Sequence, residues 1–593
     1  MKQFLVTVAG VVVGLLLFAI AAPVILIGVA ALVSRPSPPP ARTVLVLDLR
    51  GGLTDQPSDG PLAFLRGRGL SVIGIEETLR RAETDDRVKG LFVRLPEGGM
   101  APAAADELRL AFKRFRAAGK PIIAHSQGLY ADGLVTSTYE LAAASGNVWL
   151  QPASAFQVTG IARSDLFFKR FFDRHQVIAD YEQRYEYKNA VNPYLYDDYT
   201  PAHREAELSW MGSVYDTAVS DVAVDRGRRA NDIKTLLEAG PYSAEEARAK
   251  GLIDQVGQVK EAQAAILAKA GDGATLVDLD DYDGAADSRT PGFSDGNKIA
   301  VISAEGAIMT GRGGAPNPLG GEDTIRSDDV SKAFYDAIED KSVKAIVFRV
   351  SSPGGSDTAS EQILSAVRAA KAAGKPVVVS MGVYGASGGY WIASQATQII
   401  VEPTTLTGSI GVFGGKFALG PALAVFGVDA RDLKVGGDYT DAFGMGAPMT
   451  PTQKAAFSAW MDRIYNGFVA RVAAGRRLPV DRVRQIAKGR VWTGAQAKTL
   501  GLVDDLGGFY LAVDRAKTLA GIQGDARLEN FGEPRSPFAA IERMLGAGAQ
   551  GARVMAAIAA LAEDPQARAV IGEARDARLR ADGAAVLAPS LVK

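Results

Sequence analysis

Two glycine-rich turns in the second half of the chain carry serines that could do chemistry. The first is Ser351-Ser-Pro-Gly-Gly355 and the second is Tyr384-Gly-Ala-Ser-Gly-Gly-Tyr390. In the second turn Ser387 stands among glycines, which permit strained backbone dihedrals and leave room for a substrate backbone. These are features of a nucleophilic serine on a tight turn between a strand and a helix. The spacing differs from the Gly-x-Ser-x-Gly elbow, and glycine-rich turns are common, so a purely structural role is an alternative.

Other nucleophiles and metal ligands are scarce in the sequence. The chain has no cysteine, which excludes disulfides, thiolate metal sites and cysteine nucleophiles. Its histidines show no metal-site spacing, so we interpret them as packing or surface residues and expect no metal and no cofactor; they are His125, His175 and His203. The 66 basic and 67 acidic side chains nearly cancel, which gives no electrostatic reason to expect nucleic acid as a partner.

Alternating strands and helices must position the two turns. Residues 345–350 and 376–380 are apolar runs rich in β-branched side chains, and residues 360–373 between them have a helical pattern. Buried strands of a parallel sheet read as continuous apolar runs of this kind. Ligand sites gather in loops at the ends of such strands. The sequence therefore predicts an α/β fold with the glycine turns after successive strands.

The chain contains an internal duplication. Residues 88–94 (VKGLFVR) match residues 343–349 (VKAIVFR), and further matched pairs follow along both halves. At 593 residues the chain also exceeds the length that one hydrophobic core supports. We predict two copies of one α/β domain, at residues 43–279 and 298–530. A linker rich in Asp, Gly and Ser is expected at residues 280–297.

The N-terminus carries a long apolar stretch. No residue from 4 to 33 is charged, and a helix of that length would reach about 45 Å, beyond the roughly 30 Å of a bilayer core. A cleaved signal peptide is the alternative, but its apolar region spans about 7–15 residues and precedes a small-residue cleavage site. We predict an uncleaved transmembrane anchor at residues 1–34 and a stiff Pro-rich spacer at 35–42. The flanking charges leave its orientation open.

The last part of the chain, residues 531–593, is Ala-rich and partly amphipathic, with interrupting charges. We predict a helical extension there. It would pack on a partner or a membrane surface, or stay solvated.

Four motifs together give the chain a resemblance to a known family. They are the SPGG turn, the ASGGY turn, Thr405-Leu-Thr-Gly-Ser-Ile-Gly411 and Tyr187-Lys-Asn-Ala-Val-Asn-Pro193. With its duplicated body, the chain resembles the long form of the signal peptide peptidase A family, also called protease IV, over roughly residues 1–530. The resemblance implies Clp- or crotonase-like domains and a peptidase that pairs serine with lysine. One departure is Ser351, where the family more often has asparagine.

The resemblance also implies a role for each motif residue. The serine of the ASGGY turn, Ser387, would be the nucleophile, and Lys188 of the YKNAVNP run would be the general base. Ser409 of the TGSIG run would orient the lysine. The glycines that would supply oxyanion-hole amides are Gly354, Gly355 and Gly388.

Physical chemistry is compatible with a lysine in this role. A serine hydroxyl needs a neutral base, and a lysine normally keeps its proton up to about pH 10. Burial in an apolar pocket can lower the pKa of a lysine enough for work near neutral pH. Most lysines are exposed, so this role for Lys188 depends on the motif and on the lack of a candidate histidine.

The two copies differ at the expected site. The first copy holds Lys188 but has Asp132 near the position of Ser387. The second copy holds Ser387 but has Asp438, Tyr439 or Thr440 near the position of Lys188. We therefore expect the site to form between a first-copy and a second-copy domain, which a ring of alternating domains would provide.

The function implied by the resemblance is a membrane-bound serine endopeptidase that degrades cleaved signal peptides. Its partners would be signal peptides and other short apolar peptides, the membrane, and further copies of the chain in a homotetramer. It would lie in the bacterial inner membrane as a single-pass protein with its catalytic body on the periplasmic side. Two alternatives are an acyl-coenzyme A enzyme of the crotonase type, in which paired amides stabilise an enolate, and a non-catalytic membrane scaffold.

Overall fold

The computed structural model describes residues 40–57, 70–286, 297–313, 324–524, 526–532 and 586–587. The predicted anchor at residues 1–34 lies outside these ranges, as do most of the spacer and most of the C-terminal extension. Within them, none of the helices has the length and apolar character needed to cross a bilayer.

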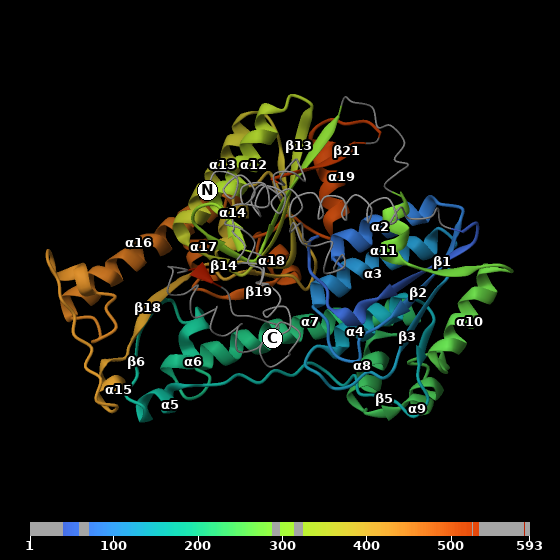
Figure 1. The fold of residues 1–593 in the computed structure, drawn as a ribbon, viewed down its shortest axis with the longest axis horizontal. Coiled ribbons are helices and arrows are strands. Elements are labelled where there is room, and N and C mark those ends of the chain that lie inside the picture. The colour runs from blue at the N-terminus through green and yellow to red at the C-terminus, as the bar shows by residue number, and fades with distance from the viewer. Residues whose placement is uncertain are drawn as a thin grey trace, which may run out of the picture.

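The first copy folds around a six-stranded parallel sheet, seen at the right of Figure 1. Its strand order is β8-β4-β3-β2-β1-β9. The strands are β1 (Thr43–Asp48), β2 (Val88–Arg94), β3 (Ile122–Ser126), β4 (Val148–Leu150), β8 (Gln255–Val256) and β9 (Thr275–Asp278).

Alternate residues of these strands face two apolar layers, as the period of a strand requires. Leu91 packs with one layer and Phe92 with the other. The first layer is covered by α2 (Val72–Thr84), α3 (Pro102–Ala117) and α4 (Val135–Ala144), and the second by α10 (Val259–Ala270).

The second copy repeats this arrangement in an eight-stranded sheet. Six of its strands pair in the order β20-β16-β15-β13-β10-β21, which matches the first sheet strand for strand. They are β10 (Lys298–Glu305), β13 (Val343–Ser352), β15 (Val377–Ala386), β16 (Gln398–Val401), β20 (Asp505–Leu506) and β21 (Arg527–Phe531). The additional strands β17 (Leu406–Gly408) and β19 (Val491–Thr493) extend from β15. The helices α12 (Ser327–Glu339), α13 (Asp357–Ala372) and α14 (Gly388–Ala393) cover one face, and α19 (Phe509–Leu519) covers the other. The predicted duplicated α/β fold is confirmed.

Local sequence signals recur in both copies. The two longest described helices, α7 (Pro201–Arg226) and α16 (Pro451–Arg476), each start with proline after a threonine cap. The hydroxyl of Thr200 accepts from the amide of the third residue of α7, His203, and Thr450 accepts from Gln453 in α16, at 3.2 Å in both. A threonine followed by proline is a common start signal for a helix because it satisfies or removes free amides.

An arm of the first copy crosses to the second copy (Figure 1). It contains α5 (Lys169–Arg174), β6 (Ile178–Arg184) and α6 (Asn192–Leu195). Strand β6 pairs antiparallel with β18 (Val412–Ala418) of the second copy along its whole length. This two-stranded ribbon brings the residues that follow β6 to the second sheet.

A buried ion-pair cluster also joins the two copies. Arg349 on β13 is 1% exposed, and its guanidinium donates to Glu107 Oε2 at 2.6 Å and to Asp55 Oδ2 at 2.9 Å. A buried cation is tolerated only when carboxylates compensate it. Because both carboxylates belong to the first copy, Arg349 fixes the second sheet against it.

The first domain extends further than predicted. Residues 280–286 of the expected linker lie in helix α11 (Leu279–Ala286). Tyr282 is buried there, and its hydroxyl donates to Asp85 Oδ2 at 3.1 Å. The Asp and Gly content of residues 280–286 predicts a linker. The burial of Tyr282 in the core of the first copy instead keeps these residues in the domain.

Candidate active site

Ser387 lies between the end of β15 and the start of α14, as the predicted turn requires. Its φ is 57° and its ψ is −116°, a conformation that side chains other than glycine seldom adopt. The Ser387 amide donates to the Gly408 carbonyl at 2.8 Å, which holds the turn against β17. The turn needs glycine at 389, where a Cβ would lie 2.6 Å from the Ser352 carbonyl oxygen.

Lys188 reaches this serine from the first-copy arm. Its Nζ lies 2.8 Å from Ser387 Oγ, although 199 residues separate the two in the chain. The lysine is 1% exposed, and its burial lowers the pKa of its amine well below the usual value. The pairing of β6 with β18 places the amine of Lys188 in a site that is shielded from solvent.

Ser409 follows β17 and contacts the same amine. Lys188 Nζ lies 3.0 Å from Ser409 Oγ and 3.1 Å from the Ser409 carbonyl oxygen. A neutral amine has two N–H donors and one lone pair. With Ser409 accepting both hydrogens, the lone pair is left to accept the proton of the Ser387 hydroxyl.

Gly489 is a positioning residue that the sequence motifs did not reveal. It has φ +83°, and a Cβ at this position would lie 2.4 Å from Lys188 Cβ. The preceding carbonyl, that of Lys488, accepts the amides of Tyr185 and Tyr187 at 3.2 Å each. The turn after α17 (Val480–Ile486) therefore packs against the backbone of Lys188 and holds it in position. No spacing rule links a glycine in one copy to a lysine in the other.

The three predicted oxyanion-hole glycines do not have equal geometry. A Cβ at Gly388 would lie 3.0 Å from the Gly355 nitrogen, so these two residues face each other beside Ser387. The Gly354 amide instead donates to Ser352 Oγ at 3.1 Å. The hydroxyl of Ser352, next to Ser351, thus holds this turn. The Gly354 amide therefore already has a partner in Ser352 Oγ, whereas Gly355 and Gly388 stay predicted oxyanion-hole donors that lie beside each other.

The first copy has no nucleophile at the matching position. Leu134 precedes α4 as Ser387 precedes α14, while Asp132 lies against Gly98 two residues earlier. In the second copy the predicted counterparts of Lys188 lie in the short helix η5 (Asp438–Asp441), away from any such site. The described residues therefore contain one serine and lysine pair. It forms within a single chain, so a neighbouring chain is not needed to bring the pair together.

A buried acidic group lies at the contact between the copies. One ligand atom each of Asp106, Glu140 and Asp221 lies within 4.8 Å of the others, a spacing that could hold a cation. Burial raises the pKa of Asp106 to about 6 and that of Glu140 well above its usual value. Two neighbouring carboxyls with raised pKa values can share a proton, as Asp106 and Glu140 could here, and Arg109 Nη2 pairs with Asp221 at 3.1 Å. Since Asp106 also accepts from the amide and hydroxyl of Thr404, we interpret the group as a support for the chain leading to Ser409.

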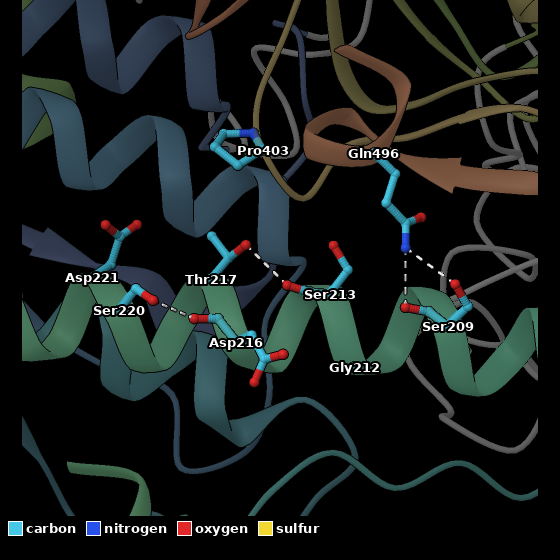
Figure 2. Close-up of a pocket in the computed structure, with 9 residues that line it drawn as sticks. All are labelled: Ser209, Gly212, Ser213, Asp216, Thr217, Ser220, Asp221, Pro403 and Gln496. Atoms are coloured by element: carbon cyan, nitrogen blue, oxygen red, sulfur yellow. Dashed lines mark hydrogen bonds between the residues drawn. The ribbon is translucent and has the colours of Figure 1, made fainter. Parts of the chain in front are cut away.

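A pocket of about 660 Å³ lies along α7 (Figure 2). One face of this helix, from Ser209 to Asp221, lines it together with Pro403 and Gln496 of the second copy. Gln496 Nε2 donates to Ser209 Oγ at 3.1 Å across the contact between the copies. The lining includes neither Ser387 nor Lys188, so the pocket is separate from the candidate active site.

A duplicated α/β body with a buried serine beside a desolvated amine has the form of a serine hydrolase. The sequence pattern of peptidase family S49 matches residues 114–271 and 369–523, one stretch in each copy. The chain is 34% identical to Protease 4 of Salmonella typhi over 506 residues, covering 81% of this chain and 79% of that protein. It is 32% identical to Protease 4 of Haemophilus influenzae, covering 82% and 80%. It is 27% identical to the chloroplastic serine protease SPPA of Arabidopsis thaliana, covering 81% and 69%.

The chain belongs to peptidase family S49 and is a serine protease. The predicted resemblance is confirmed. Membership of a peptidase family decides against the acyl-coenzyme A enzyme and the non-catalytic scaffold.

Proposed function

We propose that this serine protease degrades cleaved signal peptides with Ser387 as nucleophile and Lys188 as general base. The observation that carries the proposal is the 2.8 Å contact between Lys188 Nζ and Ser387 Oγ, in a site where the amine is 1% exposed. Ser409 orients the amine through its hydroxyl and carbonyl.

The reaction proceeds in two steps. Neutral Lys188 takes the proton of Ser387 as the hydroxyl attacks the peptide carbonyl, and the amides of Gly355 and Gly388 stabilise the oxyanion. The lysine then gives its proton to the leaving amine. The amine product departs, and the acyl group stays bonded to Ser387 as an acyl-enzyme. Water then attacks the acyl-enzyme with Lys188 again as base, the bond to Ser387 Oγ breaks, and the lysine returns the proton to this oxygen as the peptide acid leaves.

The pH dependence of cleavage tests the lysine. The base works only when neutral, and burial lowers its pKa, so activity is lost as pH falls through that lowered pKa and present above it. We expect kcat/KM for a short apolar peptide to rise with pH along one ionisation well below that of an exposed lysine. Histidine reagents should have no effect. An activity that begins to rise only near pH 10 would contradict a base whose pKa is lowered by burial.

We propose that the protease acts at the bacterial inner membrane, held by residues 1–34, with its body on the periplasmic side. Signal peptides released into a membrane are short and apolar, so an anchored protease meets them where they accumulate. Carbonate washing of membranes should leave the full-length chain bound, and the chain lacking residues 1–34 should be released. Recovery of intact full-length chain in the wash would contradict the anchor.

A homotetramer is the proposed assembly. The segment after β18 exposes apolar side chains without cover in a single chain, with Phe426 81%, Leu433 98% and Val435 96% exposed. Exposed apolar groups gathered on one segment indicate a protein contact. By analogy with the first-copy arm, this segment would pack on the first copy of a neighbouring chain.

Light scattering of the chain lacking residues 1–34 should give the mass of four copies. The double variant Leu433→Asp with Val435→Asp should give smaller species. A monomeric parent chain would refute the assembly.

A further inference from the structure

The chain places residues from its own C-terminal end beside the glycine turn of the candidate site. Strand β22 (Val586–Leu587) pairs antiparallel with β14 (Gly354–Gly355), with Gly355 opposite Val586 and Gly354 opposite Leu587. The resulting sheet has the order β12-β11-β14-β22, with β12 (Thr324–Arg326) and β11 (Ala307–Met309) behind the turn. Strand β22 also lies near β18, which belongs to the ribbon that carries Lys188.

The edge of β14 that β22 covers is the edge suited to a peptide substrate. On the other edge, the Ser356 amide donates to the Ile308 carbonyl at 2.8 Å. Main-chain groups alternate between the two edges of a strand, so the Gly355 amide is directed to the β22 edge. Gly355 also faces Gly388, the residue after Ser387. An extended chain paired there runs past the nucleophile, and two glycines present no side chain that would block it.

The C-terminal sequence has the composition of an apolar peptide. Residues 583–592 read GAAVLAPSLV and carry no charge, whereas residues 562–582 contain many acidic and basic side chains. A tethered segment also acts at an effective concentration that can reach the order of millimolar, well above that of a dilute free peptide.

We propose that the C-terminal segment around Val586 and Leu587 is a tethered occupant of the substrate edge of β14 and competes with peptide substrates. This inference rests on the proposed function, because the edge it covers is that of the Ser387 and Lys188 site.

Proline at position 586 tests the pairing in the full chain. Val586→Pro removes the backbone N–H and disrupts an antiparallel pair, whereas Val586→Ile keeps the β-branched strand residue and the amide. Mass spectrometry first verifies that each variant keeps its C-terminal segment. We then expect Val586→Pro to lower KM for a short apolar peptide severalfold with kcat unchanged. Val586→Ile should match the parent chain. An unchanged KM in Val586→Pro would overturn the proposal.

A binding measurement separates this inference from the proposed chemistry. A fluorescent peptide of residues 582–593 should bind the double variant Ser387→Ala with Val586→Pro more tightly than Ser387→Ala alone, measured by anisotropy. Equal binding to the two variants would overturn the tethered occupant, whatever the catalytic activity. If the proposed chemistry fails instead, no variant will cleave peptide, and the difference in binding will still be seen.

Discussion

Ser387→Ala should abolish peptide cleavage, and Lys188→Arg and Lys188→Ala should do nearly the same. The serine supplies the attacking oxygen, and its only described amine partner within hydrogen-bond reach is Lys188 Nζ at 2.8 Å. Arginine cannot shed its proton to act as a base. Losses of at least about 10³-fold in kcat are expected from removal of either member of such a unit. The measurement is turnover of a short apolar peptide by detergent-solubilised enzyme.

Two variants control this prediction. Lys454→Arg makes the same exchange at a lysine whose amine pairs with Asp180 at 2.9 Å, and an arginine keeps that ion pair, so activity should persist. Ser409→Ala should reduce activity less than either change in the pair, because the Ser409 carbonyl still accepts from the amine at 3.1 Å. The double variant Ser387→Ala with Lys188→Ala should be no worse than Ser387→Ala alone. Normal turnover by Lys188→Ala at neutral pH would mean that another group is the base.

Gly489→Ala should also cost much of the activity, although Gly489 has no chemical group to offer. A Cβ there would lie 2.4 Å from Lys188 Cβ and 2.6 Å from its Cα, so the lysine backbone must move. A displacement of about 1 Å at a reacting group can cost roughly 10²-fold in rate. We expect a fall of that order in kcat, with a smaller effect on KM.

Gly374→Ala is the matched control for backbone strain. Gly374 has φ +78°, close to the +83° of Gly489, but a Cβ there would meet nothing within 4 Å. Both alanine variants should lose about 1 kcal/mol of unfolding free energy to the left-handed conformation, and Gly489→Ala should lose more because its Cβ also overlaps Lys188, as measured by denaturant unfolding. Only Gly489→Ala should lose turnover. Equal turnover in the two variants would show that the turn does not hold Lys188 in place.

The sequence predicted those features that depend on neighbouring residues. The position of Ser387 between β15 and α14 followed from an apolar run that ends in glycines. The duplicated fold followed from repeated segments, because apolar periodicity and helix start signals are local properties. Residues 280–286 show the limit of composition, since burial of Tyr282 holds a segment that reads as a linker in a helix.

The tertiary structure decided what depends on residues far apart in the chain. A motif could suggest Lys188, but only the pairing of β6 with β18 brings its amine to Ser387, and only the surrounding packing removes the water that would keep it protonated. The contact of Gly489 with Lys188 and the pairing of Val586 with Gly355 likewise join segments hundreds of residues apart. Desolvation and contact geometry are properties of the assembled site, so no local pattern in the sequence specifies them.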